Sequence, residues 1–257
     1  MASGKIDPMH QFMIQPIAGS FEGGNPFVFT NSALWLLIVL GTIYVFMLGG
    51  MKRELIPGRW QVAVEGLIGF VNSMVHASIG PAGKKYMPWV FTAFMFILFS
   101  NLMGAMPFGV VEQAHPFTVT SQFTITVVMS FISFAIVLVV GFWKHGLHFF
   151  SLFWPKNTPF LLAIPISLIE FLSFLIRPFS LGLRPFIAMF AGHILLEVFG
   201  NFIVKGLQAG GGGIAISILC FFFVAFINAL ELLVGAIQAY VFALLTSLYI
   251  SDAEHLH

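Results

Sequence analysis

The sequence predicts an all-α polytopic membrane protein with about five transmembrane helices, one interfacial helix and a long tilted helix hairpin at the C-terminal end. Hydrophobic residues make up 59% of the 257 residues, charged residues make up only 8%, and the mean hydropathy is +0.98. A soluble domain carries about 25% charged residues, so this chain cannot cover a water-facing surface. Its apolar runs are continuous and do not alternate at every second residue, which argues against a transmembrane β-barrel. We therefore expect one membrane domain over the whole chain.

The charges and the cysteine count exclude several functions. Eleven Lys and Arg residues against ten Asp and Glu residues give a net charge of +1, without any block of like charge. Nucleic-acid binding by phosphate neutralisation needs a basic stripe, so no nucleic-acid partner is expected. The single cysteine, Cys220, allows no internal disulfide and no cysteine-based metal site, and we expect neither a metal nor a cofactor.

The N-terminal part of the chain contains the first predicted span. Residues 1–31 lack the apolar core of a signal peptide and are expected to lie on the outer side of the membrane. A helix needs about 20 apolar residues to cross the hydrocarbon of a bilayer. Residues 32–51 meet this requirement, and the run stops at Lys52 and Arg53.

Residues 60–83 differ from the spans because polar side chains interrupt the apolar ones. Gln61, Glu65, Asn72 and His76 lie among Val, Leu, Ile and Phe residues. This pattern is typical of a helix that lies along the membrane interface. A short re-entrant span is the alternative.

The rest of the chain supplies the remaining spans. Residues 88–143 contain two runs of spanning length, 88–110 and 123–143. Residues 159–251 form a long, predominantly apolar block that is interrupted by the turn Ala209–Gly213, whose consecutive glycines are poor helix formers. This last block therefore predicts two long helices in a hairpin.

Each helix of this hairpin is longer than one perpendicular crossing requires. Such a helix is either broken or strongly tilted, and tilt is the usual answer to excess apolar length. We favour two oblique helices, the first of them kinked near Pro178 and Pro185.

The cations predict the orientation of the chain in the membrane. Loops on the cytoplasmic side carry an excess of Lys and Arg. Most cations flank the loops after the first and third spans: Lys52, Arg53, Arg59, Lys84, Lys85, Lys144 and Lys156. We therefore expect the N-terminus outside and the C-terminus in the cytoplasm or matrix.

Ionisable residues inside the long apolar block are the main functional signal. A charge near the centre of a membrane helix costs about 2.5–3.5 kcal/mol and is functional by default. At about 100° per residue, one polar stripe within roughly 80° runs along the first helix. It consists of Glu170, Ser173, Arg177, Ser180 and Arg184.

The second helix of the hairpin carries a similar stripe. Its members are Asn228, Glu231, Gly235, Gln238, Thr246 and Tyr249. Two facing polar stripes would form a hydrated path, or half of one. His193 together with Glu231 would suit a proton relay, because imidazole titrates near neutrality and burial raises the pKa of a carboxyl towards it.

Structural roles remain open for several of these residues. Arg177 could pair with Glu170 seven positions earlier, and His193 could be an ordinary core histidine. Arg184 resists such a reading, because no acid lies three or four positions away on its own helix. A guanidinium keeps its charge in a protein, so a group outside this helix must compensate Arg184.

Several strings of residues carry a resemblance to a known family. The string Leu181-Gly182-Leu183-Arg184-Pro185-Phe186, followed by Met189-Phe190-Ala191-Gly192-His193, resembles the signature of subunit a of rotary F-type ATP synthases. The segments 96–104, 169–181, 236–242 and 249–253 resemble further motifs of this family in the expected order. The resemblance extends from about Met9 to the C-terminus.

The chain also departs from the family pattern near the signature arginine. Ala188 stands where the family usually carries Asn, Pro185 replaces a Leu, and Ile187 replaces a small residue. Compared with the family pattern, one hydrogen-bonding side chain is therefore missing beside Arg184, and we expect the local backbone to bend more.

The resemblance implies a function and a set of partners. It implies a non-enzymatic membrane subunit that couples proton flow to ATP synthesis, with a c-ring, peripheral-stalk b subunits, the lipid bilayer and transported protons as partners. It implies two offset aqueous half-channels that load and unload the carboxylates of the c-ring. It also implies a bacterial inner membrane or a mitochondrial inner membrane.

The same resemblance implies roles for individual residues. Arg184 is the essential cation between the half-channels, and Gln238 supports it. His193 and Glu231 line the outer half-channel, and Glu170 and Ser173 line the inner one. Further positions near the path are Asn101, Arg177, Asn228 and Tyr249.

Other functions fit the sequence less well. An ion-coupled secondary transporter with a midplane site is the main alternative, but inverted repeats and paired broken helices are not visible. A membrane protease would need a catalytic motif such as GxSxG or HExxH, and neither is present. A purely structural scaffold does not account for Arg184 and the two polar stripes.

Overall fold

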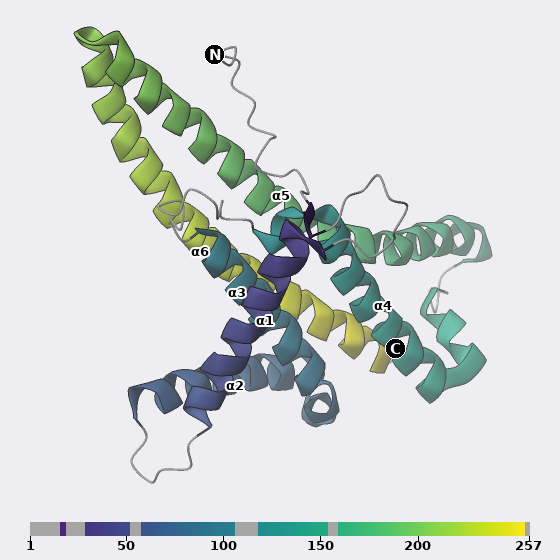
Figure 1. Ribbon diagram of the computed structural model, residues 1–257. Helices are drawn as coiled ribbons and strands as arrows, with labels where there is room; N and C mark the ends of the chain where they lie inside the picture. Colours follow the sequence, from purple (N-terminus) through teal and green to yellow (C-terminus); the bar gives the residue numbers. More distant parts are fainter. Residues whose placement is uncertain (1–15, 19–28, 52–57, 106–117, 154–158, 255–257) are drawn as a thin grey trace. The chain divides into compact units, whose positions relative to one another are not determined.

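The computed structural model describes residues 16–18, 29–51, 58–105, 118–153 and 159–254. Most of these residues lie in the six long helices of Figure 1. The helices are α1 (Asn31–Gly50), α2 (Arg59–Ile79), α3 (Met87–Ala105), α4 (Phe123–His145), α5 (Phe160–Ala209) and α6 (Gly212–Glu254). Three short 3-10 helices connect some of them: η3 (Pro81–Lys85), η5 (Val119–Ser121) and η6 (Gly146–Phe153).

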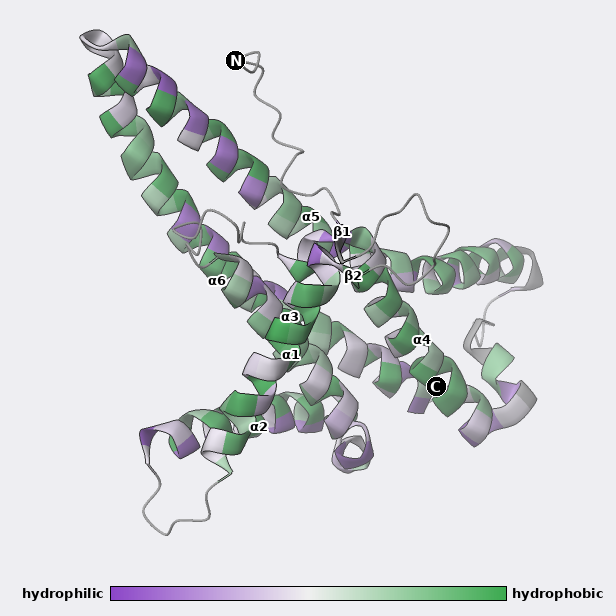
Figure 2. Cartoon of the chain, in the orientation of Figure 1, coloured by the Kyte–Doolittle hydropathy of each residue, from purple (hydrophilic) through white to green (hydrophobic). Residues whose placement is uncertain are grey.

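The predicted all-α membrane fold is confirmed. In the described part of the chain, six helices are long and apolar enough to cross a membrane. Figure 2 colours each residue by its hydropathy and shows that hydrophobic residues predominate along these helices. One of the six is α2, so its length and composition fit a crossing, and the interfacial placing of 60–83 stays a prediction. A two-stranded antiparallel ribbon, β1 (Pro16–Ala18) with β2 (Phe29–Thr30), was not predicted.

Some predictions concern residues outside the described ranges. Most of the N-terminal segment 1–31 belongs to them, and so do the cations Lys52, Arg53 and Lys156. The outer-side placing of the segment and the contribution of these cations to the orientation remain expectations.

The described residues divide into two compact units, each assembled from segments that are distant in sequence. The first unit comprises the described residues of the ranges Met1–Tyr44, Phe96–Gln122 and Pro185–Gln238. The second comprises the described residues of Val45–Met95, Phe123–Arg184 and Ala239–His257. Both long helices, α5 and α6, contribute one part to each unit.

The first unit contains the turn of the predicted hairpin. Gly210 and Gly211 have φ values of +65° and +51°, in the left-handed region that residues with a Cβ atom rarely adopt. Beyond the turn, the Ser217 hydroxyl donates a hydrogen bond to the carbonyl of Ile203 at 2.9 Å. The rings of Phe199 on α5 and Phe223 on α6 stack with centroids 5.7 Å apart. These contacts hold the two helices antiparallel near the turn.

Aromatic side chains pack α4, η6 and α5 together in the second unit. The ring of Phe174 lies 5.0 Å from that of Phe134 and 6.0 Å from that of Phe149. Both Phe149 and Phe174 are buried. Although Pro178 and Pro185 follow within the same helix, α5 remains α-helical through both of them.

The second unit also contains the junction of α1 and α2. The indole of Trp60 donates a hydrogen bond to the carbonyl of Phe46 at 2.8 Å. Gly49 and Gly50 make this approach possible, because a Cβ atom on Gly49 would lie 2.6 Å from the indole nitrogen. On Gly50, the added Cβ would instead overlap the side chain of Val64.

Candidate functional site

The ten predicted site residues divide between the two units. The first unit contains Asn101, His193, Asn228, Glu231 and Gln238, and the second contains Glu170, Ser173, Arg177, Arg184 and Tyr249. Along α5 the division falls directly after Arg184, and along α6 it falls directly after Gln238. The predicted site residues therefore form two sets, one in each unit.

A histidine and a carboxylate form the centre of the set in the first unit. His193 Nδ1 on α5 lies 2.6 Å from Glu231 Oε1 on α6. The Glu231 carboxylate is almost fully buried, with 2% of its side chain exposed, and the His193 side chain is 10% exposed. Gly192 allows this approach, because a Cβ atom there would lie 2.8 Å from Glu231 Oε1. A buried carboxylate beside an imidazole can exchange a proton with it.

The second ring nitrogen of His193 also has a polar partner. Its Nε2 atom contacts the hydroxyl of Thr118, which lies just before η5. The imidazole therefore connects a hydroxyl with a carboxylate, an arrangement that can pass a proton along a chain of groups. Sequence analysis did not identify Thr118. The available signal was the mostly polar segment Thr118–Gln122, which lies directly before a predicted span.

Within the same unit, Asn101 on α3 contacts α6. Its side-chain nitrogen donates a hydrogen bond to the carbonyl of Gly235 at 3.0 Å. Its side-chain oxygen accepts a hydrogen bond from the hydroxyl of Thr120. Gly235 permits this close contact, because a Cβ atom there would lie 2.9 Å from Asn101 Cβ. Asn101 is buried and hydrogen-bonded at both ends of its amide, which suits a residue that fixes α3 against α6.

Two further site residues of the first unit lie on α6. Asn228 is half-buried. The side-chain oxygen of Gln238 is buried and has no hydrogen-bond partner among the described residues. An unpaired buried acceptor costs about 1–3 kcal/mol, so Gln238 has an unused capacity to accept a hydrogen bond.

Polar residues also recur along α5 between the His193–Glu231 pair and the turn. His193, Glu197, Asn201 and Lys205 follow one another at intervals of four residues. Such spacing places them on one face of the helix. In Figure 2, hydrophilic bands recur along this part of α5. A polar face thus leads from the buried pair towards the turn.

In the second unit, Arg177 on α5 pairs with the end of α6. Its Nη1 atom lies 2.9 Å from Asp252 Oδ2, and its guanidinium lies over the ring of Tyr249 at 4.9 Å from the centroid. The alternative pairing with Glu170 is not formed. Glu170 and Ser173 are instead exposed on α5.

Sequence analysis missed Asp252 as a polar partner. Asp252 follows Tyr249 by three positions and so shares its helix face, and this spacing was the signal available. The hydroxyl of Ser180, which the polar stripe included, donates a hydrogen bond to the carbonyl of Arg177 at 3.0 Å. Ser180 is therefore satisfied by its own helix.

Close packing against α4 fixes the helical face on which Arg184 lies. A Cβ atom on Gly182 would be 2.7 Å from Ser130 Oγ and 3.1 Å from both the Thr126 carbonyl oxygen and Val127 Cα. Gly182 therefore presses against the α4 backbone. Arg184 comes two residues later, about 200° around the helix, and so lies on the other side of α5.

The charge of Arg184 is not compensated within the described part of the chain. Its side chain is exposed, and it has no ion-pair partner among the described residues. The arginine nearest to it in sequence, Arg177, is by contrast paired. Arg184 thus presents a permanent positive charge on the exposed side of α5.

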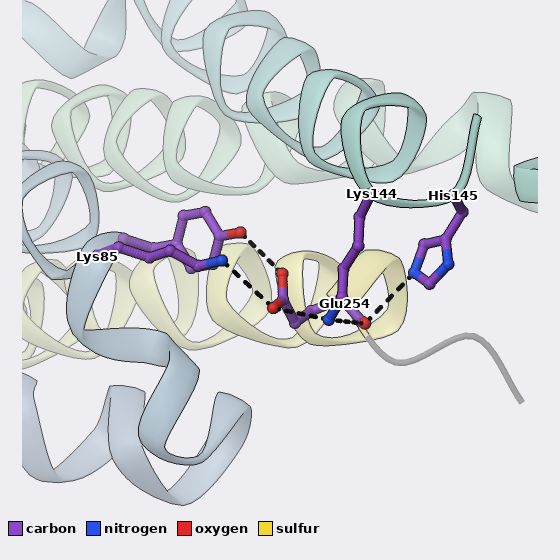
Figure 3. A network of polar contacts seen from close by, with 5 residues as sticks. Lys85, Lys144, His145 and Glu254 are labelled. Atoms are coloured by element: carbon purple, nitrogen blue, oxygen red, sulfur yellow. Dashed lines mark hydrogen bonds and ion pairs between the residues drawn. The ribbon is translucent and has the colours of Figure 1, made fainter.

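A separate cluster of polar contacts surrounds Glu254 at the end of α6 (Figure 3). The buried Glu254 carboxylate lies 2.9 Å from Lys144 Nζ on α4 and 3.3 Å from Lys85 Nζ at the end of η3. It also accepts a hydrogen bond from the Tyr86 hydroxyl at 2.8 Å. Burial raises the pKa of Tyr86 above its ordinary value, so the hydroxyl remains a donor at neutral pH.

The main chain at the end of α6 takes part in this cluster as well. The Glu254 carbonyl accepts a hydrogen bond from Lys144 Nζ at 2.9 Å and contacts the His145 ring at 3.4 Å. Cations at a helix C-terminus satisfy carbonyl groups that the helix leaves unpaired. The cluster therefore fastens the end of α6 to α4 and η3. Sequence analysis did not identify Glu254.

Comparison with known proteins identifies similar sequences over the whole chain. The family model described as ATP synthase A chain matches residues 32–251. The sequence is 60% identical to a protein named ATP synthase subunit a from Sphingopyxis alaskensis, and the match covers 99% of this chain and 98% of that protein. Identity is 56% with the protein of the same name from Novosphingobium aromaticivorans, with 100% of both chains covered. For the one from Mesorhizobium japonicum, identity is 42% and coverage is 99% of both chains.

Proposed function

The chain belongs to the ATP synthase A chain family, and we propose that it forms two offset aqueous half-channels that carry protons to and from the carboxylates of a c-ring. Proton flow through these half-channels drives rotation of the ring and so couples to ATP synthesis. The chain itself is a non-enzymatic stator subunit in this proposal. Its partners are the c-ring, the b subunits of a peripheral stalk, the lipid bilayer and the transported protons.

The uncompensated charge of Arg184 is the observation that carries this proposal. A permanent cation in the middle of a membrane helix requires a negative group from another molecule, because a lone charge is costly in the membrane. A carboxylate of the c-ring supplies that group. The fixed cation favours the ionised form of the carboxylate, so each ring carboxyl must release its proton before it passes Arg184. Gln238, whose side-chain oxygen has spare acceptor capacity, supports Arg184 in this role.

The polar groups of the first unit form the outer half-channel in this proposal. Protons enter along the polar face of α5 and reach the pair His193 and Glu231. Thr118 and Asn101 hold the surrounding groups in place. Asn228 lies one turn of α6 before Glu231 and contributes to the same path.

The exposed polar groups of the second unit form the inner half-channel. Glu170 and Ser173 lie on α5 and receive protons that leave the ring. Arg177, held by Asp252 and Tyr249, sets the electrostatic potential beside them. Because Asp252 neutralises Arg177, the pair does not compete with Arg184 for a ring carboxylate.

The decisive experiment is ATP-driven proton pumping in native membrane vesicles that carry Arg184→Ala. Assembly of the complex is checked on the same membranes, and Arg59→Ala serves as the control because it removes an exposed arginine that lies outside the proposed path. We expect pumping to be abolished in Arg184→Ala and retained in Arg59→Ala. Undiminished pumping in an assembled Arg184→Ala complex would refute the proposal and favour a secondary transporter.

The proposed orientation places the N-terminus outside and the C-terminus in the cytoplasm or matrix, in a bacterial or mitochondrial inner membrane. Cys220 is the only cysteine, so a Cys220→Ala chain offers a clean background for labelling. In sealed vesicles of known sidedness, a membrane-impermeant maleimide should label Lys84→Cys from the inner side and Gln208→Cys from the outer side. Both positions are exposed. Labelling of the two positions from the same side would refute this orientation.

A further inference from the structure

A cavity lies at the corner where α2 ends and η3 begins, apart from the residues proposed for the proton path. Its volume is about 330 Å³. This volume is at the lower end of the range of about 300–1,000 Å³ in which small ligands bind. The lining residues are Asn72, Val75, His76, Gly80, Pro81 and Lys84. The cavity lies entirely within the second unit.

Local backbone interactions and close packing fix the conformation of this corner. Gly80 ends α2 with a φ value of +79°, and its N–H donates a hydrogen bond to the His76 carbonyl at 2.9 Å. Pro81 then starts η3. A Cβ atom on Gly83 would lie 2.8 Å from a methyl group of Val75, so η3 packs tightly back onto α2. The cavity is thus formed before any ligand binds.

The charge of the lining selects an anion. Lys84 carries a positive charge and has no ion-pair partner among the described residues. The neighbouring Lys85 is different, because it is committed to Glu254. Asn72 and His76 add hydrogen-bond donors, and no carboxylate lines the cavity. A phosphate group matches this combination of one cation and several neutral donors.

The surroundings of the cavity favour a lipid as the source of the phosphate. Apolar side chains of α2 are exposed over the preceding turns, including Val62 and Ile68. A lipid can place its headgroup in the cavity and its acyl chains along this apolar surface. Basic pockets at the cytoplasmic ends of membrane helices bind anionic headgroups in this way.

We propose that the cavity at the α2–η3 corner binds the phosphate-bearing headgroup of an anionic phospholipid, with Lys84 as the main charged contact. The proposal uses the predicted inner-side position of Lys84 but none of the proton-path residues. Failure of one proposal is therefore distinguishable from failure of the other.

The test uses the purified, assembled complex and a photoactivatable phosphatidylglycerol with its reactive group near the headgroup. Mass spectrometry quantifies adducts on the peptides that cover residues 59–85 of this chain. We expect clear labelling in the wild-type complex and a reduction of roughly fivefold in Lys84→Gln, as expected for the loss of one cation near an anionic lipid. Lys84→Arg should keep most of the labelling, and Lys205→Gln, which changes an exposed lysine outside the cavity, should not alter it.

Competitors identify the source of the phosphate. Unlabelled phosphatidylglycerol should displace the probe, whereas phosphatidylcholine and millimolar inorganic phosphate should not. Equal labelling in wild-type and Lys84→Gln complexes would overturn the proposal. Displacement by inorganic phosphate at a concentration as low as that of phosphatidylglycerol would show a site for free phosphate and would overturn the lipid assignment. ATP-driven pumping in Lys84→Gln membranes should stay normal and confirms that the variant folds.

Discussion

The guanidinium of Arg177 lies 2.9 Å from the carboxylate of Asp252, which joins the first half of α5 to the last turn of α6. The two residues are 75 positions apart in sequence. Their side chains are 26% and 48% exposed, so solvent weakens the attraction between them. The pair therefore contributes little to stability, and its main effect is to neutralise a cation beside the proposed inner half-channel.

Asp252→Asn should reduce proton pumping while it leaves the complex assembled. The free energy of unfolding should change by no more than about 1 kcal/mol, as for other exposed pairs. Pumping should fall because Arg177 becomes an uncompensated cation beside the proposed inner half-channel, where it repels protons near Glu170 and Ser173. The measurement is ATP-driven pumping in vesicles, with Asp252→Glu as the control that keeps the charge. Normal pumping in both Asp252→Asn and Arg177→Gln would exclude the pair from the path.

Glu231→Gln should slow proton flux without uncoupling it from ATP hydrolysis. Glutamine fits the same space but cannot exchange a proton with His193, which lies 2.6 Å from the native carboxylate. Loss of one proton-exchanging group should lower the flux by at least about tenfold. Pumping and ATP hydrolysis are measured together, and passive leak through the membrane is measured separately. Wild-type flux in an assembled Glu231→Gln complex would remove Glu231 from the channel.

The helices and the turn could be predicted from the sequence because both depend on local composition. Apolar runs of spanning length correspond to described helices, and the glycine run occupies a turn with positive φ at Gly210 and Gly211. The helical period also predicts that Arg177 and Arg184 lie on one stripe. None of these inferences requires knowledge of the neighbouring helices.

The partners of the polar side chains could not be predicted in the same way. Whether Arg177 meets Glu170 or Asp252 depends on how α5 and α6 pack, which periodicity does not determine. The carboxylate of Glu254 contacts Lys85 of η3, Tyr86 and Lys144 of α4, which lie far from it in sequence. Thr118 was missed for the same reason, because its hydroxyl acquires a partner only when His193 is brought to it.

Gly192→Ala should disturb the His193–Glu231 pair. The added methyl group would lie 2.8 Å from Glu231 Oε1, so the carboxylate must move away from the imidazole or the helices must separate. Overpacking of this kind costs about 1–3 kcal/mol. We expect slower pumping and a lower melting temperature of the purified complex.

Gly200→Ala provides a matched control for Gly192→Ala. Gly200 lies on the same helix, and a Cβ atom there would meet nothing within 4 Å. Alanine stabilises a helix interior by about 0.5–1 kcal/mol relative to glycine, so this variant should be neutral or slightly more stable. If the two variants behaved alike, the contact between Gly192 and Glu231 would not matter.

Glu254→Ala should loosen the end of α6. The variant leaves Lys85, Lys144 and Tyr86 without their shared acceptor. Hydrogen bonds to a charged group are worth about 1.5–3 kcal/mol, and the partial exposure of both lysines puts the expected loss near the lower value. Thermal unfolding of the purified complex measures the loss. Glu65→Ala is the control, because Glu65 is an exposed carboxylate of the same unit, and it should have a smaller effect.

Gly182→Ala should separate α5 from α4 and displace Arg184. The nearest obstacle to the added methyl group is Ser130 Oγ at 2.7 Å, followed by main-chain atoms of Thr126 and Val127 at 3.1 Å. Main-chain atoms cannot move aside as a side chain can. We therefore expect the free energy of unfolding to fall by about 1–3 kcal/mol and pumping to be reduced.

A second substitution distinguishes the two sources of this clash. Ser130→Ala removes the hydroxyl but leaves the contacts with the α4 backbone, so the double variant Gly182→Ala with Ser130→Ala should recover part of the stability. Pumping should recover less than stability, because the remaining main-chain contacts still shift the turn of α5 that carries Arg184. Full recovery of both would mean that only the serine hydroxyl limits the packing. In that case the α4 backbone would have no part in fixing the position of Arg184.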